Sequence, residues 1–464
     1  MAEEITDATA SLEAMASGSL RAVELVASYL DRLEAQQETL NGAVQIFRSE
    51  ALERAKSPKS GPLSGLPFSV KETFGMKGEQ ITAGSLRMPP IVCDEDSEIV
   101  KRVKNAGAII IARSNIPEFA MAGETDNPRF GRSNNPLNTS RTCGGSSGGE
   151  GVLVASGSSA VGLGSDVLGS LRIPGCFCGV VAFKPASNAV DKWGTWPVID
   201  GYMDSWLSLG PITRSVRDAR LLYNVIADKP TAPLQSVKAL RLILPTHFPI
   251  NTKVSCIAAA LSESIAALLD SGMQGEDYHF DDVERFFTNL QPLLAHDFES
   301  DIRKQLKTEK GKDFSIVKEA VLQILGKPTI YSGLFQLLLA CPIVRTKRPE
   351  KIERIVADFE NGRRRYAQLL KDDAILVFPT LGLLAPEHGK MNRASLKPGV
   401  NKDMTSVAFC NAMNLPAITV PAPKFRDEAT GLVPGIMLAT APGNESILFD
   451  AASVVESALG ESEK

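Results

Sequence analysis

The chain has 464 residues, of which 44% are hydrophobic and 22% are charged. This balance is close to that of an average globular protein, so it excludes a disordered chain, a collagen-like repeat and a disulfide-stapled miniprotein. Fifty basic residues stand against 54 acidic ones, and the net charge of -4 gives no electrostatic reason to expect a nucleic-acid or acidic-membrane partner.

Cysteine usage and the first residues of the chain indicate a reducing compartment. The seven cysteines are odd in number and scattered, and the opening MAEEITDATASLEAM is acidic, unlike a secretory signal. The long apolar stretch at 334–344 falls short of the roughly 20 residues that cross a bilayer. We therefore expect a cytoplasmic protein without a transmembrane segment.

Hydrophobic periodicity predicts helices and strands in alternation. Residues 8–36 place apolar side chains every three to four positions, as in an amphipathic helix. Short apolar runs at 66–70 and 108–112 then alternate with helical stretches such as 97–105. This alternation predicts an α/β fold, with a parallel or mixed sheet and helices outside it. Further strand-like runs, typical of a return to the same sheet, fall at 240–244, 374–378 and 416–420.

The chain is expected to form a single domain over residues 1–464. It has no internal repeat and no low-complexity tract, and a closing helix is predicted at 445–459. A charged, helical region from about 256 to 370 carries few special residues. We interpret it as an excursion from the main fold.

The densest chemical signal is a loop rich in Asn, Pro, Gly and Ser at 125–151. It contains GGSSGG at 144–149, and Ser170 follows Ser146 by 24 residues within GLGSDVLGSLRIPG. Glycines let the main chain approach a ligand closely, and successive N–H groups in such turns can hold an oxyanion. A flexible linker is the less favoured reading because the flanks are apolar, and a P-loop is disfavoured because no GK[ST] follows the glycines.

A nucleophile elbow of an α/β hydrolase is a second reading of the same loop, with Ser147 as the nucleophile. Such an elbow needs an apolar strand before it and a histidine later, but the preceding residues are NNPLNTSRTC. The four histidines are read as surface or locally bonded groups, and Cys176 and Cys178 as buried thiols, so no metal site is expected. The histidines are His247, His279, His296 and His388.

A serine nucleophile without a histidine needs another base, and Lys71 is the candidate. It ends the apolar run 66–70, where a strand buried on both faces would carry the amine out of water. Lowering the pKa of a lysine from about 10.4 to near 7.4 corresponds to roughly 4 kcal/mol, which lies within the range of buried amines. On these residues alone, a strand-end lysine that reaches solvent remains the simpler reading.

Three ordered motifs resemble the amidase signature family of serine hydrolases, and most closely its fatty acid amide hydrolase-like branch. They are GPLSGLPFSVKETF, CGGSSGGEG and GLGSDVLGSLRIPGCFCGVVAFKP. The resemblance implies a large mixed, twisted sheet covered by helices on both faces. Region 250–370 lacks recognisable motifs, and in this family the corresponding region varies with substrate.

The resemblance also implies a Ser-Ser-Lys relay. Lys71 would be the base, Ser146 the bridging serine after a cis peptide bond, and Ser170 the nucleophile that forms an acyl-enzyme. No cofactor and no metal are implied.

The oxyanion hole implied by the resemblance is formed by four main-chain N–H groups, those of Val167, Leu168, Gly169 and Ser170. Leu168 departs from the family pattern, which has a glycine there, so the oxyanion loop or the pocket must adapt to a side chain. Glu72 replaces an aspartate that commonly follows the lysine, as it also does in the fatty acid amide hydrolase branch.

The resulting expectation is a hydrolase that cleaves the C–N bond of small amides, and also esters or carbamates, with an apolar acyl or aryl part. The residues expected to line its substrate pocket are Phe119, Met121, Leu334 and Phe335, for which core packing is the competing role. A homodimer is kept open as the oligomeric state.

Two alternatives remain open. The first is the glutamine-hydrolysing subunit of a tRNA-dependent amidotransferase, which would share the triad but need a charged pocket and a partner surface. The second is a catalytically silent binding protein, which is disfavoured because all three triad positions are filled.

Overall fold

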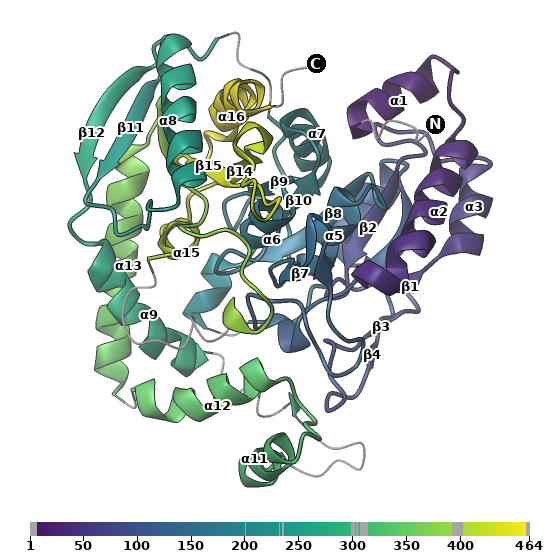
Figure 1. The fold of residues 1–464 in the computed structure, drawn as a ribbon, viewed down its shortest axis with the longest axis horizontal. Helices are drawn as coiled ribbons and strands as arrows, with labels where there is room; N and C mark the ends of the chain where they lie inside the picture. Colours follow the sequence, from purple (N-terminus) through teal and green to yellow (C-terminus); the bar gives the residue numbers. More distant parts are fainter. Residues whose placement is uncertain are drawn as a thin grey trace.

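The computed structural model describes residues 7–199, 201–231, 233, 236–297, 302, 305–306, 314–346, 348–391 and 402–460. Within this part of the chain, eleven strands form one mixed sheet that runs through the molecule (Figure 1). Its strands, in spatial order, are β1 (Ala43–Ile46), β5 (Ile109–Ser114), β2 (Pro67–Lys71), β8 (Val161–Asp166), β10 (Ser208–Thr213), β9 (Val181–Lys184), β14 (Ala417–Pro421), β15 (Gly435–Ala439), β13 (Ala374–Pro379), β11 (Arg241–Thr246) and β12 (Gln274–His279). The strands predicted at 66–70, 108–112, 240–244, 374–378 and 416–420 are all present, as β2, β5, β11, β13 and β14.

Parallel pairing is confined to two parts of the sheet. β2 pairs in parallel with both β5 and β8, and β11 pairs in parallel with β12 and β13. The remaining pairs are antiparallel. The sheet is therefore mixed, and β2 is enclosed between two parallel neighbours.

Helices cover both faces of the sheet. Ala182 and Phe183 are successive residues of β9, so their side chains point to opposite faces. Phe183 packs against Tyr223 of α7 (Val216–Ile226) and Phe449 of α16 (Glu445–Leu459), while Ala182 faces Gly175 of α6 (Arg172–Cys178). In Figure 1, α16 lies between α8 (Ser255–Asp270) and α7, and α5 (Gly148–Ala155) lies with α6.

The first predicted helix is two helices in the structure. α1 (Ala8–Ala16) ends before Gly18, whose φ of +75° interrupts the helix, and α2 (Ala22–Leu40) begins after it. Apolar residues of α2 continue the same spacing, so periodicity alone did not reveal the break. The other elements of this half are α3 (Arg48–Ala55), β3 (Gln80–Ile81), β4 (Ile91–Val92), α4 (Glu98–Asn105), η1 (Glu118–Ala120), β6 (Asn134–Asn135), β7 (Asn138–Thr142) and η2 (Tyr202–Trp206).

The region expected to be helical from 256 to 370 also contributes a strand. β12 forms one edge of the sheet, and its residues QGEDYH are mostly exposed. A strand without a buried face has no alternating apolar pattern, so periodicity could not indicate it. The helices of this region and those that follow are α9 (Val283–Asp297), α11 (Ile316–Ile324), α12 (Ser332–Val344), α13 (Pro349–Leu369), α15 (Thr405–Ala412) and η3 (Pro423–Phe425).

None of the helices in the described ranges is both long enough and apolar enough to cross a membrane. The seven cysteines all lie within the described residues, and none of them forms a disulfide bond there. The predicted closing helix at 445–459 is present as α16.

Candidate active site

Lys71 lies at the carboxyl end of β2 and is completely buried. All five residues of this strand are buried because β5 and β8 flank it and helices cover the sheet. The Nζ of Lys71 is 2.8 Å from Oγ of Ser146 and 2.9 Å from Oγ of Ser165. The amine therefore contacts two hydroxyl groups rather than solvent.

Burial determines the basicity of this amine. It lowers the pKa of Lys71 to about 7, although the negative charges of Asp166 and Glu150 favour the ammonium form and raise it. A large fraction of Lys71 is therefore neutral near pH 7, which is what a general base requires.

Ser146 follows a cis peptide bond from Gly145, and the main chain is tightly packed at this point. A Cβ on Gly145 would lie 2.6 Å from the carbonyl oxygen of Ala122, and one on Gly149 would lie 2.4 Å from the amide nitrogen of Asn115. Gly144 has a φ of +83°, which side chains rarely allow. The glycines thus permit the close backbone approach that places Ser146 beside Lys71.

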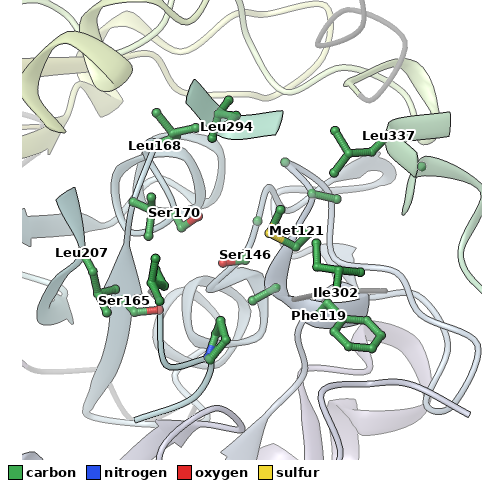
Figure 2. A pocket seen from close by; sticks show the side chains of 18 of the residues that line it. Phe119, Met121, Ser146, Ser165, Leu168, Ser170, Leu207, Leu294, Ile302 and Leu337 are labelled. Carbon is green, nitrogen blue, oxygen red and sulfur yellow. The ribbon is translucent and has the colours of Figure 1, made fainter. Parts of the chain in front are cut away.

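Ser170 lies between the end of β8 and the start of α6. Its carbonyl oxygen accepts a 3.1 Å hydrogen bond from the N–H of Ser147, which ties the two serine-containing segments together. Ser146, Ser165 and Ser170 all line one cavity. Figure 2 shows the Ser146 and Ser170 hydroxyl groups pointing into the space between them.

Asp166 organises the turn that leads to Ser170. Its carboxylate accepts from the N–H groups of Gly169 (2.7 Å) and Leu171 (3.1 Å), and it pairs with the buried guanidinium of Arg172 at 3.0 Å. Burial would raise the pKa of Asp166, but Arg172 lowers it to about 2, so the group remains a carboxylate.

The hydrogen bond to Asp166 changes the expected set of oxyanion donors. Four N–H groups were predicted, but that of Gly169 already donates to the carboxylate. Val167, Leu168 and Ser170, which line the cavity, retain N–H groups that do not donate to Asp166. The other three N–H groups therefore remain as the candidate oxyanion donors.

The cavity has a volume of about 270 Å³ and a mainly apolar lining. In the described part of the chain, no charged side chain lines it. Figure 2 shows Leu168, Leu294 and Leu207 on one side and Phe119, Met121, Ile302 and Leu337 on the other. The remaining lining residues are Ala120, Ala122, Gly123, Gly145, Val167, Ile173, Trp196, Pro197, Ile199, Gly333, Leu338, Cys341 and Met404, together with the three serines.

Two of the four residues expected to line the pocket do not do so. Phe119 and Met121 line it, but Leu334 and Phe335 do not; they pack with Ile330 in the core cluster behind this wall. Helix α12 meets the cavity with Gly333, Leu337, Leu338 and Cys341 instead. Because α12 is apolar on every side, its sequence did not indicate which face would be turned toward the cavity.

With this geometry established, the chain can be compared with known proteins. Residues 24–449 match the family described as Amidase. The chain belongs to the amidase family.

Two of the matching proteins have names that describe different activities. A glutamyl-tRNA(Gln) amidotransferase subunit of Carboxydothermus hydrogenoformans is 32% identical over 299 residues, which cover 60% of this chain and 60% of that protein. The match to this relative therefore spans less than two thirds of its length. Fatty-acid amide hydrolase 2 of Homo sapiens is 25% identical over 477 residues, covering 95% of this chain and 86% of the relative.

A solved structure confirms the fold of the amidase. The 6-aminohexanoate cyclic dimer hydrolase complexed with substrate superposes with a TM-score of 0.80 and 23% identity, covering 98% of this chain and 97% of that one. The predicted amidase signature fold, a large mixed sheet with helices on both faces, is therefore confirmed.

Ser165 is the polar group of the amidase site that the sequence analysis missed. It lines the cavity and lies 2.9 Å from the Lys71 amine. A usable signal was present, because Ser165 immediately precedes Asp166 at the end of a strand that leads into the Ser170 turn. Strand ends beside a catalytic turn commonly carry site residues.

The competing elbow nucleophile does not reach the cavity of the amidase. Ser147 is fully buried, and its hydroxyl donates to the carbonyl of Ser165 at 3.2 Å. None of the four histidines lines the cavity in the described residues; His247 and His279 pack against each other, and His388 contacts the carbonyl of Thr139.

Proposed function

We propose that this amidase hydrolyses the C–N bond of small amides with an apolar acyl or aryl part, through an acyl-enzyme on Ser170. One observation carries the proposal. A buried lysine amine lies 2.8 Å from the hydroxyl of Ser146, and Ser146 shares an apolar cavity with Ser170.

The proton path of acylation follows from this arrangement. Neutral Lys71 accepts the proton of Ser146, and Ser146 accepts the proton of Ser170 as the Ser170 Oγ attacks the substrate carbonyl. Breakdown of the tetrahedral intermediate expels the amine, and the proton returns through Ser146 to the leaving nitrogen. Water then attacks the acyl-enzyme by the same route and releases the carboxylic acid.

The negative charge on the intermediate needs hydrogen-bond donors. Val167, Leu168 and Ser170 line the cavity, and their main-chain N–H groups are the donors of this proposal. In comparable acyl-transfer sites the loss of one such donor lowers kcat by about 100- to 1,000-fold. Asp166 and Arg172 fix the turn that presents these groups.

The cavity lining supports an apolar substrate. Binding an α-amino acid such as glutamine requires partners for its ammonium and carboxylate groups, because burying an unpaired charge is unfavourable. The described lining offers hydroxyl and main-chain groups but no charged side chain. Esters and carbamates present the same carbonyl to Ser170 and are additional substrate classes of this proposal.

The second candidate is a glutamine-hydrolysing subunit that supplies ammonia to a partner protein acting on tRNA. The 32% identity to the Carboxydothermus amidotransferase protein favours it. The apolar lining speaks against it, unless a partner completes the site with charged groups.

One substrate panel separates these functions. The purified chain is assayed against nitroanilides of apolar acids, fatty amides, carbamates and glutamine, with Ser170→Ala as the inactive variant. We expect turnover of an apolar amide by the chain alone, and a loss of at least about 1,000-fold in Ser170→Ala.

Ser453→Ala provides a matched control, because it removes one hydroxyl group from α16, outside the cavity. It should retain full activity. Ammonia release from glutamine only in the presence of a partner would replace this proposal with the second one.

A further inference from the structure

Glu118 is a buried carboxyl group that joins two walls of the cavity. Only 1% of its surface is exposed. Its Oε1 lies 2.6 Å from the hydroxyl of Ser85, and its Oε2 accepts a 2.6 Å hydrogen bond from the N–H of Tyr331. Tyr331 is the N-cap residue of α12, the helix that supplies one wall.

The other wall is the segment that follows Glu118 in the chain and carries Phe119 and Met121. Phe119 has a φ of +58° and Ala120 a φ of +55°, a conformation that bulky residues rarely adopt. The N–H of Phe119 donates to the carbonyl of Ala83 at 2.8 Å. This turn places Phe119 and Met121 in the cavity, so it needs side-chain and main-chain bonds to hold it.

A second buried carboxyl group, that of Glu319, binds the residues that immediately precede α12. Glu319 of α11 accepts from the N–H groups of Thr329 (2.8 Å) and Ile330 (3.2 Å). The Nε of Arg87 donates to the hydroxyl of Thr329 at 2.8 Å. Residues 329–331 are thus fixed to the body of the protein immediately before the helix enters the cavity wall.

We propose that Glu118 is a positioning residue of the substrate cavity, which fixes the start of α12 against the turn that carries Phe119 and Met121. The proposal rests on the proposed function, since it takes this cavity as the substrate site. It adds a group outside the cavity lining that determines the relative position of two walls.

The protonation state of Glu118 controls the strength of this connection. Burial raises its pKa to about 7. The charged groups that face it are Glu319, which raises the pKa further, and Arg87, which lowers it; α12 carries no charged side chain. When protonated, Glu118 carries no buried charge and still accepts from the N–H of Tyr331. Its own O–H can then donate to the Ser85 hydroxyl, which also accepts from the N–H of Arg87, so the Ser85 proton must turn to another acceptor.

The direction of the pH effect follows by linkage. If α12 separates locally from the turn, Glu118 becomes hydrated and its pKa returns toward the ordinary value of 4.5. The attached state therefore binds the proton more tightly than the open state. Attachment is strongest below pH 4.5, weakens as the pH rises from 4.5 to about 7, and stays constant above about 7, where both states have lost the proton.

Glu118→Gln tests this directly, because the amide reproduces the hydrogen bonds of the protonated acid and cannot ionise. Hydrogen exchange of the first turn of α12 is measured from about pH 5 to about pH 8 and corrected for the intrinsic exchange rate. We expect protection in the wild-type protein to fall by up to about tenfold per pH unit as the pH rises toward 7 and to level off above it. Glu118→Gln should remain protected, and Glu118→Ala should lose protection at every pH.

Glu456→Gln is the matched control. Glu456 of α16 is also largely buried, accepts a main-chain N–H from Val216 at 2.8 Å and has a pKa raised by burial to about 7, but it lies outside the cavity. It should leave the pH dependence of exchange in α12 unchanged.

Kinetics on an apolar nitroanilide complete the test. Glu118→Ala should raise KM at least about fivefold with a smaller change in kcat, and Glu118→Gln should restore KM. Equal exchange in all variants and an unchanged KM would overturn the positioning role. Hydrogen exchange is measured without turnover, so it tests the positioning role separately from the hydrolase assignment. If the hydrolase assignment fails, the protein would be inactive on every substrate but would still show the expected exchange pattern.

Discussion

The two parts of the amidase site are built in different ways. The Lys71–Ser146–Ser170 part rests on a central strand, close backbone contacts at glycines and buried polar bonds, so almost every residue there has a particular geometric requirement. The wall formed by α12 is a mostly apolar helix whose sequence has no distinct polar face. In the proposed function, the first part carries out the chemistry and the second helps to shape the substrate cavity.

Replacing the base should give the largest effect that distinguishes the two parts. Lys71→Met keeps the length of the side chain and removes the amine, so the proton can no longer be returned efficiently to the leaving group. We expect kcat on an amide to fall by about 100- to 10,000-fold, with a smaller loss on an ester of the same acid, because an alkoxide leaves more readily than an amine. Equal losses on both substrates would contradict the relay.

The pH profile of the wild-type enzyme gives the next largest effect. The neutral amine is the active form and the pKa of Lys71 is about 7, so the ammonium form accumulates as the pH falls below 7. We expect kcat/KM to fall by about tenfold per pH unit below about 7 and to level off above it. A profile that instead falls as the pH rises from about 6 to about 7 would exclude a lysine base.

Ser165→Ala probes the hydroxyl that the sequence analysis missed. Removing it leaves Lys71 with one of its two hydroxyl partners, so we expect kcat to fall by about three- to tenfold, in line with the loss of one buried hydrogen bond. Ser165→Thr retains the hydroxyl and should restore much of the activity in the same assay. An unchanged kcat in Ser165→Ala would show that the contact with Ser146 alone is sufficient.

The smallest effect tests which face of α12 meets the cavity. Both Leu337 and Phe335 pack against the core cluster of this wall, but only Leu337 also lines the cavity. Leu337→Ala should raise KM for a large apolar amide by about two- to tenfold. Phe335→Ala should lower the melting temperature with little change in KM. The reverse outcome would mean that the opposite face of the helix binds substrate.

The difference between the two parts of the site also explains which features of the structure the sequence could predict. The strand that carries Lys71, the glycine-rich loop and the turn at Ser170 have strong local patterns, and the structure brings all three together. Edge strand β12 was missed because its exposed residues have no alternation, and the helix break at Gly18 was missed because apolar spacing continues across it.

Other features depend on the folded structure and have no pattern in the sequence. The hydrogen bond from the N–H of Gly169 to Asp166 is one of them, because it forms only in the folded turn. The orientation of α12 is equally hidden, since it depends on contacts with Glu118 and Glu319, which lie outside the helix.

Lys71 lies on β2, which is flanked by two parallel strands, and this position has a consequence for thermal inactivation. A base on a surface loop could regain water, and with it an ordinary proton affinity, while the rest of the enzyme stayed folded. Here the amine is dehydrated by β5, β8 and the helices above them. The lowered proton affinity should therefore persist as long as the central sheet is folded, and the enzyme should keep its activity at neutral pH until cooperative melting begins.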